Sequence, residues 1–419
     1  MGTHYSSKLF SNFIALSIIQ GTNFLLPILF MPFVIKRVGA DGFGVIAVAQ
    51  VIMVYLSTLS DYGFNLTATR DIALYRNDKP KTSRIFYTVL ASKLLLTLVS
   101  FLVLLVLVLT VPLFRNNYSL YLLGFTYVLG QSLMASWFFQ GMEKMQYITV
   151  ITLLGRIIFI FLVFGFIRDR DDKKLFLFFL GTGNIIAGIV SIYLAHRIFK
   201  LTVYRPRYTD IRHELKEGWQ ITVSNLSINA YMYINVFVLR LFTNDLTVGY
   251  YSVAEKIFFA TRQILGIYSL VIYPRVCQIA QEGRRQVIGF FKEIYLPFLL
   301  LMLVGCSGVF FFSERIVFLF LGDRPMLPVV LLRILAFVPV IVCLNIPAYL
   351  VLLALNQKRS YLRVLVLGTV VNLAVNLLLV NIWGPVGTAI SIIITETFIT
   401  TGLNAALYKK YYQSPVLKK

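Results

Sequence analysis

Charged residues are scarce in this sequence of 419 residues, at 14%, against about 25% in an average soluble domain. Cysteine and histidine are nearly absent, with three of each, and the cysteines have neither the C-x-x-C spacing nor any other metal-ligand spacing. We therefore expect no disulfide framework and no metal site. Together with the hydropathy described next, these shortages exclude a secreted domain, a soluble enzyme and a disordered chain.

Hydrophobic residues are abundant, at 58% of the chain, and the mean hydropathy is +0.79. They recur in runs of about 20 residues, the length that crosses a bilayer as a helix. Because no barrel-like alternation accompanies them, we predict an all-α integral membrane protein. The runs predict twelve transmembrane helices, at residues 10–35, 43–66, 85–113, 119–139, 147–167, 175–196, 218–241, 248–273, 293–313, 327–353, 362–382 and 385–407.

Lysine and arginine outnumber the acidic residues by 39 to 18, which gives a formal net charge of +21. They lie mainly in short loops and form no separate basic domain, so we expect membrane lipids and no nucleic acid as partners. With the N-terminus placed in the cytoplasm, 24 of the 39 fall in inner segments and 10 in outer segments. This bias predicts that the N- and C-termini are both cytoplasmic. We read the first residues as part of the first span, not as a cleaved signal peptide.

The two halves of the chain share weak sequence similarity. Residues 33–50 and 237–255 both begin Phe-Val and later read Gly-x-x-x-Val-Ala, and the Lys-x-x-Tyr of 144–147 returns at 358–361. The displacement is about half the chain, as in transporters built from parallel repeats. We predict two pseudo-symmetric six-helix bundles, the N-terminal lobe at 1–199 and the C-terminal lobe at 218–419, joined by a cytoplasmic linker at 200–217.

Apart from three at the very ends of spans (Arg240, Glu293 and Arg363), eight charged residues fall within the predicted spans, and five of them are basic. Each costs about 2.5–3.5 kcal/mol at the centre of a membrane helix, so each is expected to face a cavity or a partner. A cationic cavity suits an anionic substrate, and arginine binds phosphate best. The cavity candidates are Arg156, Arg262, Lys256, Arg333 and Lys93, and the acidic candidates for ion coupling are Asp61, Glu255 and Glu396.

Simpler interpretations stand beside these. Lys93 lies near a helix start and can snorkel to the interface, while Arg333 lies near the outer end of its span and can meet water. Glu255 and Lys256 can each pair with another helix, and Glu396 can make an interhelical hydrogen bond. Asparagines are candidates for glycan contacts, although interhelical hydrogen bonds explain them equally. These are Asn23, Asn225, Asn229, Asn372 and Asn376.

Catalytic motifs are missing from the sequence. It contains no Walker motif, no cluster of acid, base and nucleophile, and no loop long enough for a catalytic domain. We therefore expect no enzyme activity and no cofactor.

Three stretches resemble a known family when taken together and in order. SDYGFNLTATRDIA (60–73) is similar to a segment of bacterial polysaccharide and O-antigen repeat-unit flippases that ends in a Thr-Arg-Asp-like triplet. ASWFFQGMEKMQYIT (135–149) resembles their junction between spans 4 and 5, and residues 354–391 resemble their Asn-rich region with a Gly-x-x-Gly turn. The resemblance extends over the whole chain. It points to the polysaccharide-transport branch of the multidrug/oligosaccharidyl-lipid/polysaccharide exporter superfamily.

The resemblance implies two six-helix bundles in a V shape around a central cavity. It implies a substrate, undecaprenyl-diphosphate carrying an oligosaccharide, that moves from the cytoplasmic to the outer leaflet of the bacterial inner membrane. By position, Arg70 and Asp71 become candidates for the inner gate or substrate entry. Alternating access coupled to an ion gradient is the expected mechanism, and the polysaccharide polymerase machinery is a possible partner.

Two other functions stay open at this point. A multidrug antiporter of the same superfamily exports cations, for which an anionic cavity is expected, whereas the charges within the spans here are mostly basic. A membrane polysaccharide polymerase is expected to have a large outer loop and no half-chain repeat.

Overall fold

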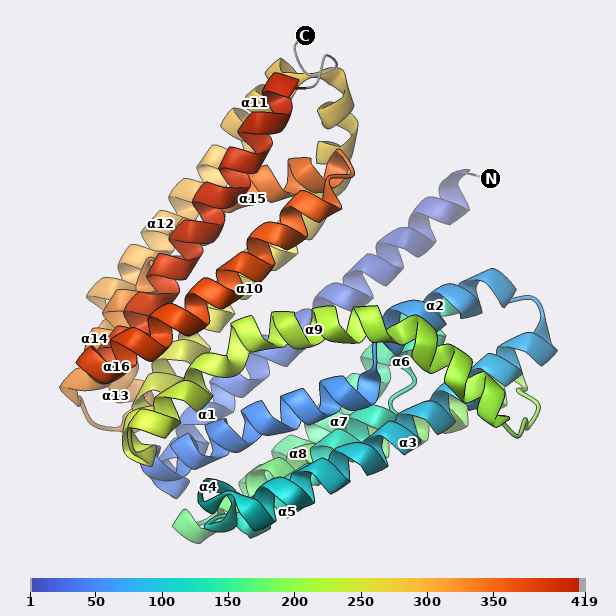
Figure 1. The fold of residues 1–419 in the computed structure, drawn as a ribbon, viewed down its shortest axis with the longest axis horizontal. Helices are drawn as coiled ribbons and strands as arrows, with labels where there is room; N and C mark the ends of the chain where they lie inside the picture. Colours follow the sequence, from blue (N-terminus) through green and yellow to red (C-terminus); the bar gives the residue numbers. More distant parts are fainter. Residues whose placement is uncertain (1, 414–419) are drawn as a thin grey trace. The chain divides into compact units, whose positions relative to one another are not determined.

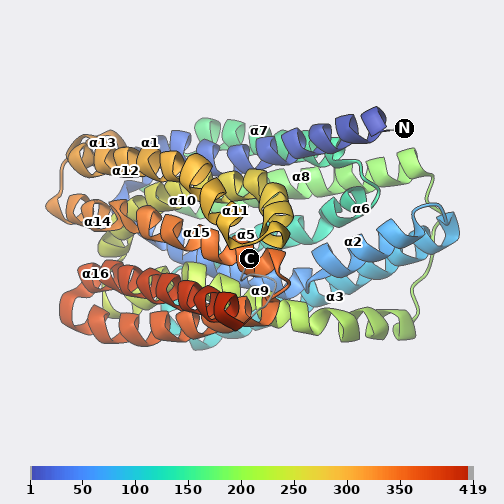
Figure 2. The same cartoon turned by 90° about the horizontal axis from the view of Figure 1, so that it is seen from above.

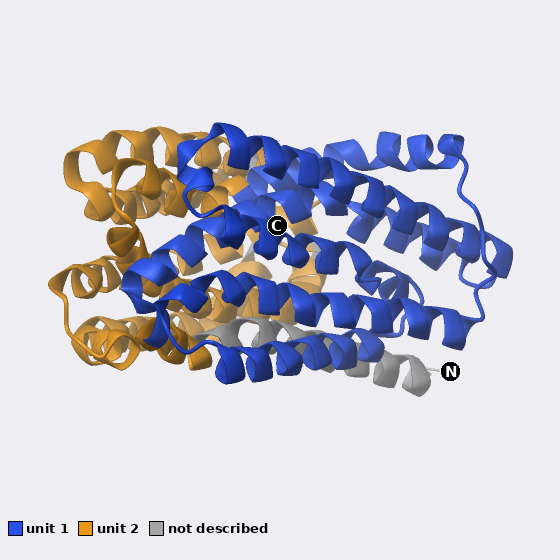
Figure 3. Cartoon of the chain, turned by 90° about the horizontal axis from the view of Figure 1, so that it is seen from below, with its two compact units in different colours: residues 1–26, 37–229 blue, residues 27–36, 230–419 orange. Residues whose placement is uncertain are grey.

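The computed structural model describes the backbone of residues 2–413. The side chains of residues 2–28, Gln281, Arg284, Lys358 and 410–413 lie outside the described part. Throughout the described residues the chain is helical and has no strand, as the apolar runs predict. It divides into two compact units, unit 1 (residues 1–26 and 37–229) and unit 2 (residues 27–36 and 230–419), each described below by itself (Figure 3).

The helices up to α9 belong largely to unit 1 (Figure 1). They are α1 (Gly2–Asp61), α2 (Phe64–Tyr75), α3 (Lys79–Thr110), α4 (Pro112–Arg115), α5 (Tyr118–Leu133), α6 (Ser136–Gly141), α7 (Met145–Phe166), α8 (Lys173–Phe199) and α9 (Tyr208–Phe242), with a short 3-10 turn η1 (Arg170–Asp172) before α8. Residues 230–242 of α9 and 27–36 of α1 belong to unit 2.

The remaining helices form unit 2. They are α10 (Asp245–Glu282), α11 (Arg284–Phe290), a π-helical turn η2 (Phe291–Tyr295), α12 (Leu296–Phe311), α13 (Ser313–Leu321), α14 (Met326–Ala336), α15 (Val338–Ala354) and α16 (Lys358–Gln413). Two long helices contain a residue with non-helical backbone, Gly39 in α1 (φ 80°) and Gly384 in α16 (φ 56°). Glycine adopts such positive φ values without the steric cost that a side chain adds.

The two halves of α16 pack against each other on either side of Gly384. A Cβ atom added to Gly368 would lie 2.6 Å from Cγ1 of Ile399, and the Asn372 amide donates to the Thr395 hydroxyl at 3.2 Å. Figure 2 shows the halves as two rods side by side, joined at one end. The Gly-x-x-Gly stretch of the sequence is therefore the point at which this helix folds back.

Nine helical segments within the described residues are long and apolar enough to cross a membrane. This finding supports a membrane-spanning helical protein, while the count of twelve stays a prediction. One segment, Arg359–Lys409, contains both of the last two predicted spans, and α1 runs through the first two. The predicted span 218–241 lies on α9, which is not among the nine because amide and hydroxyl side chains interrupt its apolar residues.

Glycines bring α5 and α8 close together in unit 1. A Cβ atom at Gly181 would lie 2.1 Å from the Thr126 hydroxyl oxygen, and one at Gly130 would lie 2.6 Å from Cβ of Asn184. Small residues at such contacts let helices pack tightly inside a membrane. This contact fixes the C-terminal end of α5, whose carbonyl groups bind a buried lysine described below.

Two of the stretches that carry the family resemblance contact each other in unit 1. The aromatic stretch on α6 is buried, with Trp137 at 1% exposure, and its main-chain carbonyl accepts a hydrogen bond from the Thr69 hydroxyl on α2 at 3.1 Å. A Cβ atom at Gly141 would lie 2.7 Å from Ile72. These two stretches therefore form the contact between α2 and α6.

Both copies of the predicted repeat lie at corresponding places along their helices. Residues 33–50 surround the break at Gly39, and residues 237–255 surround the junction of α9 and α10. Tyr147 lies in the first turn of α7, and Tyr361 lies in the first turn of α16. The duplication itself stays a prediction.

Candidate functional site

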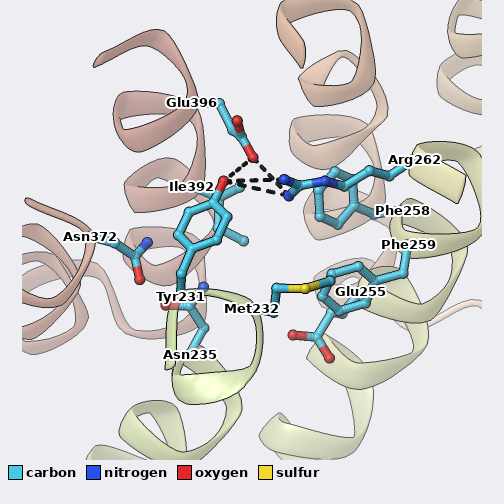
Figure 4. Close-up of a pocket in the computed structure, with 10 residues that line it drawn as sticks. All are labelled: Tyr231, Met232, Asn235, Glu255, Phe258, Phe259, Arg262, Asn372, Ile392 and Glu396. Carbon is cyan, nitrogen blue, oxygen red and sulfur yellow. Dashed lines mark hydrogen bonds and ion pairs between the residues drawn. The ribbon is translucent and has the colours of Figure 1, made fainter. Parts of the chain in front are cut away.

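A small pocket in unit 2 is lined by side chains from α9, α10 and α16 and has a volume of about 10 Å³, the space of a single water molecule (Figure 4). Its lining combines aromatic and aliphatic side chains with amide and charged groups. The lining residues are Tyr231, Met232, Asn235, Glu255, Phe258, Phe259, Arg262, Asn372, Ile392 and Glu396.

An ion pair joins α10 to α16 in this pocket. Nη1 of Arg262 lies 2.8 Å from Oε1 of Glu396, and the Tyr231 hydroxyl on α9 donates to the same oxygen (Figure 4). The Arg262 guanidinium also lies 5.4 Å from the centre of the Tyr231 ring. Three helices thus meet at one carboxylate oxygen.

The two members of this pair differ in exposure. The Glu396 side chain is 1% exposed, whereas the Arg262 side chain is 25% exposed. A ligand that enters the pocket can therefore reach the guanidinium before the carboxylate. A cavity candidate and an ion-coupling candidate, predicted separately from the sequence, are bound to each other.

The other predicted residues of unit 2 divide between the pocket and its surroundings. Glu255 lines the pocket at 3% exposure, whereas the neighbouring Lys256 is half-buried and is not among the lining residues. Asn372 lines the pocket, and its side-chain oxygen is buried without a hydrogen-bond partner. The Asn376 amide instead donates to the Asn235 side chain at 2.8 Å, the interhelical bond that the sequence left open.

Arg333 lies away from these groups, on α14. Its Nη2 is 2.9 Å from a carboxylate oxygen of Glu314, its Nε donates to the Ser313 hydroxyl, and its side chain is 38% exposed. Arg333 is not among the residues that line the pocket. The contacts correspond to the simpler interpretation, an arginine at the end of its helix in an exposed ion pair.

Unit 1 contains a second ion pair, between α3 and the end of α1. Nζ of Lys93 lies 2.8 Å from Oδ1 of Asp61, and it also donates to the main-chain carbonyls of Gln131 at 3.3 Å and Met134 at 3.5 Å. The Lys93 side chain is 2% exposed and the Asp61 side chain 31%. Lys93 is therefore held inside the unit and does not extend to its surface.

Asp61 lies directly before a sharp turn of the backbone. Tyr62 and Gly63 both have positive φ, 46° and 75°, and separate α1 from α2. The second carboxylate oxygen of Asp61 accepts a hydrogen bond from the Asn65 amide at 2.7 Å. The turn and these two bonds determine where the carboxylate points.

Arg156 on α7 belongs to the same polar cluster. Tyr127 on α5 interacts electrostatically with both Arg156 and Asp61 and hydrogen-bonds to the Gln131 side chain. Three predicted residues, Asp61, Lys93 and Arg156, are thus brought together in unit 1. Nothing in the sequence singles out Tyr127, because tyrosines are frequent throughout the chain.

Arg70 and Asp71, the entry candidates, lie on α2 and contact α9. Nε of Arg70 is 2.8 Å from Asp71, its Nη2 is 2.7 Å from Glu217, and its side chain is 57% exposed. Burial and the nearby carboxylates of Asp71 and Glu217 raise the pKa of Glu214 to about 7. Glu214 was missed by the sequence analysis, although Asp210, Glu214 and Glu217 are spaced along one face of a helix.

Asp210, at the start of α9, hydrogen-bonds both to α3 and to the segment 200–207 that connects α8 to α9. Its carboxylate accepts hydrogen bonds from Arg84 and from the Tyr204 hydroxyl, both at 2.7 Å, and from the main-chain N–H of Arg207. Burial disfavours the charged form, but these three bonds outweigh it and lower the pKa of Asp210 to about 2. The connector between α8 and α9 is therefore ordered by one carboxylate.

The remaining asparagines are placed as follows. The Asn229 amide donates to the Thr58 hydroxyl at 2.7 Å within unit 1, and Asn225, one turn earlier on α9, is half-buried. Asn23 lies on α1, and its side chain is outside the described residues. Among the described residues, His, Cys, Asp and Glu form no group of three or more that could hold a metal.

The chain is similar to transport proteins over nearly its full length. It is 28% identical over 402 residues to a protein of Escherichia coli (strain K12) named as an O-antigen transporter, covering 93% of this chain and 94% of that protein. Its fold is similar to the lipid II flippase MurJ in its inward closed conformation, with a TM-score of 0.70, 14% identity and coverage of 96% of this chain and 87% of the other.

A multidrug resistance transporter of the MATE family, in an inward-facing conformation, has a similar fold, with a TM-score of 0.67, 16% identity and coverage of 95% of this chain and 99% of the other. The family model described as polysaccharide biosynthesis protein matches residues 9–280. The chain is thus a multi-pass membrane transport protein and not an enzyme. It belongs to the polysaccharide biosynthesis protein family, within the polysaccharide-transport branch of the multidrug/oligosaccharidyl-lipid/polysaccharide exporter superfamily.

Proposed function

We propose that this protein is a flippase for undecaprenyl-diphosphate-linked oligosaccharide units. It moves them from the cytoplasmic to the outer leaflet of the bacterial inner membrane, for O-antigen or another surface polysaccharide. The observation that carries this proposal is the partly exposed Arg262 side chain, which lines the pocket of unit 2. An accessible guanidinium can bind a phosphate through two parallel hydrogen bonds, while the polyprenyl chain stays in lipid.

The glycan has suitable partners in the same pocket. The amides of Asn235 and Asn372 and the hydroxyl of Tyr231 are hydrogen-bonding groups among the aromatic rings of Phe258 and Phe259. Arg156, in the polar cluster of unit 1, is a separate candidate for contact with the diphosphate. Arg70 and Asp71, exposed on α2, are the proposed entry residues.

The proposed topology has twelve membrane crossings with both termini in the cytoplasm. Two six-helix lobes, 1–199 and 218–419, flank the linker 200–217. The two halves of α16 support this topology, since residues 358–383 and 385–413 are each ~39 Å long or more, enough to cross the ~30 Å hydrocarbon core. Transport proceeds by alternating access coupled to an ion gradient, with Asp61, Glu255 and Glu396 as the coupling groups.

A multidrug antiporter is the second candidate. The fold similarity to a MATE transporter and the 31% exposure of the Asp61 carboxylate favour it, because an accessible acid attracts a cation. The pocket of unit 2 argues against it, since its acids are almost completely buried and its arginine is the exposed charge.

The deciding experiment determines which leaflet contains the lipid-linked oligosaccharide in a strain that lacks this gene. Cytoplasmic accumulation with loss of surface glycan, rescued by the wild-type gene and by Arg333→Gln but not by Arg262→Gln, would support the flippase. Normal surface glycan with increased sensitivity to cationic drugs would instead support the antiporter. Single units stranded on the outer face would indicate a polymerase.

A further inference from the structure

The Glu396 carboxylate is bound to the guanidinium of Arg262, the group to which a substrate phosphate would bind. Its Oε1 atom is 2.8 Å from Nη1 of Arg262, and the same oxygen accepts the Tyr231 hydroxyl. Nη2 of Arg262 lies 3.5 Å from the Tyr231 hydroxyl oxygen (Figure 4). The carboxylate thus holds the arginine through one oxygen, without the two-pronged geometry that makes arginine–carboxylate pairs strong.

Access to the pair is one-sided. Arg262 is 25% exposed while Glu396 is 1% exposed, so a phosphate reaches the guanidinium while the carboxylate stays buried behind it. Displacement would leave Glu396 with the neutral Tyr231 hydroxyl as its remaining hydrogen-bond donor in Figure 4. A buried carboxylate without a counter-charge is strongly disfavoured.

The neighbouring charges do not replace the lost partner. Among the residues that line the pocket, Arg262 is the one cation, and a second acid, Glu255, is present. A diphosphate on Arg262 therefore adds negative charge beside two carboxylates, which favours uptake of a proton. The ionisable groups on the helices packed around Glu396 include Tyr231 on α9, Glu255, Lys256 and Arg262 on α10, Arg333 on α14, Cys343 and Tyr349 on α15, and Tyr361 on α16 itself.

We propose that Glu396 is a built-in substitute for the substrate's phosphate. In the empty carrier it neutralises Arg262. An incoming diphosphate displaces it, and the released carboxylate takes up one proton from a hydronium ion or protonated buffer molecule of the solution, so that its O–H bond forms as the bond in the donor breaks. The site thus binds an anion and a proton together, rather than exchanging one for the other. This inference rests on the proposed function, because it assumes that the anion binds Arg262.

The pairing has a consequence for the transport cycle. A lone guanidinium costs several kcal/mol in a membrane interior, whereas a paired one is nearly neutral. Glu396 therefore lets the empty carrier return to the cytoplasmic side. It also weakens substrate binding, because only the fraction of molecules with Arg262 unpaired can accept the anion.

The test is a binding measurement on the full chain in lipid nanodiscs, with farnesyl diphosphate as the probe and farnesol as the uncharged control. Titration calorimetry at mildly acidic and mildly alkaline pH, in buffers of different ionisation enthalpy, counts the protons taken up. The variants are Glu396→Gln, Arg262→Gln and the matched control Glu314→Gln, which removes an acid that is 54% exposed in the Arg333 pair of the same unit.

We expect Glu396→Gln to bind the diphosphate at least about tenfold more tightly at alkaline pH, as expected if roughly nine-tenths of the wild-type carriers are paired. We also expect it to take up about one proton fewer than wild type. Because the probe is the same, its own protonation cancels in that difference. Infrared difference spectra should show a carboxylic acid band on binding in wild type and in Glu314→Gln, but not in Glu396→Gln.

The outcomes separate the two proposals. Binding that depends on Arg262 but has the same affinity and proton count in Glu396→Gln would overturn the inference and leave the flippase intact. Absence of diphosphate binding in wild type and in both pocket variants would overturn the role of this pocket in the proposed function. If Glu396→Gln does not fold, the infrared spectrum of the wild type alone tests the inference. Absence of the carboxylic acid band on diphosphate binding would show that no carboxylate is protonated and would overturn the inference.

Discussion

The ion pairs of the two units have the same length and opposite exposure. Lys93–Asp61 in unit 1 and Arg262–Glu396 in unit 2 each join a base to an acid at 2.8 Å. In unit 1 the base is 2% exposed and the acid 31%, whereas in unit 2 the acid is 1% exposed and the base 25%. Unit 1 thus presents a negative charge to its surroundings, and unit 2 presents a positive one.

The buried member of each pair is held by different groups. Two carbonyls at the C-terminal end of α5 accept hydrogen bonds from Lys93, where the helix dipole also favours a cation. The Tyr231 hydroxyl donates to Glu396. Main-chain carbonyls cannot move away without unwinding a helix, whereas a tyrosine side chain can rotate. The comparison indicates that the base of the pair in unit 1 is held more firmly than the acid of the pair in unit 2, which can open.

The largest effect is expected from Asp61→Asn. It leaves Lys93 buried without a counter-charge, and removal of one partner from a buried pair lowers the free energy of unfolding by about 3–5 kcal/mol. Unfolding in detergent micelles measures this. The exposed pair serves as a control, since Glu314→Gln should cost less than about 1 kcal/mol. Equal losses in the two variants would contradict a structural role for the unit 1 pair, and Asp61→Asn with Lys93→Met should recover most of the stability.

Arg262→Gln tests the other side of the comparison. We expect transport of the lipid-linked oligosaccharide to fall by about a hundredfold, because a charged hydrogen bond worth up to about 3 kcal/mol is lost. The rate of appearance of the glycan in the outer leaflet measures it. Arg333→Gln should stay within about twofold of wild type. Arg262→Gln leaves the buried Glu396 carboxylate unpaired, which can itself destabilise the fold. The double variant Arg262→Gln with Glu396→Gln removes both charges and shows whether the loss of transport reflects misfolding. Transport restored in the double variant would argue against anion binding by Arg262.

Tyr231→Phe is expected to have a smaller effect. It removes the hydroxyl that donates to Glu396, which should lower the free energy of unfolding by about 1–1.5 kcal/mol while the ring contact with Arg262 is kept. Tyr208→Phe, at the 78% exposed start of the same helix, is a suitable control. A loss as large as that of Asp61→Asn would mean that the pair in unit 2 is as rigid as the pair in unit 1.

The smallest effect concerns pH and the contact of α2 with α9. Since the pKa of Glu214 is raised to about 7, the folded chain binds this proton more tightly than the unfolded chain. Its contribution to stability is therefore complete below the ordinary value of 4.5 and is lost as the pH rises to about 7. Midpoints of unfolding across this range should decline in wild type and decline less in Glu214→Gln. Parallel curves would show that Glu214 has no raised pKa.

Much of the candidate site was predictable, because charge in an apolar span is conspicuous. Asp61, Lys93, Arg156, Glu255, Arg262 and Glu396 all stand out in the sequence, and the structure places the first three in one cluster and the others in or beside one pocket. Tyr127, Tyr231 and Asn235 were not singled out. Tyrosine is common in this chain, and nothing in its local sequence distinguishes one that meets a carboxylate.

The class of protein can be read from the sequence alone. Apolar runs of bilayer length require helices, because lipid offers no hydrogen-bond partner to the backbone, and three motifs in order identify the family. Which charges pair, and which member of each pair is exposed, depends on how the helices pack. Arg262 and Glu396 are 134 residues apart and Lys93 and Asp61 are 32 apart, so packing between helices, through residues such as Gly130, Gly181 and Gly384, brings them together. Exposure depends on what covers each side chain in three dimensions, and no local pattern encodes that.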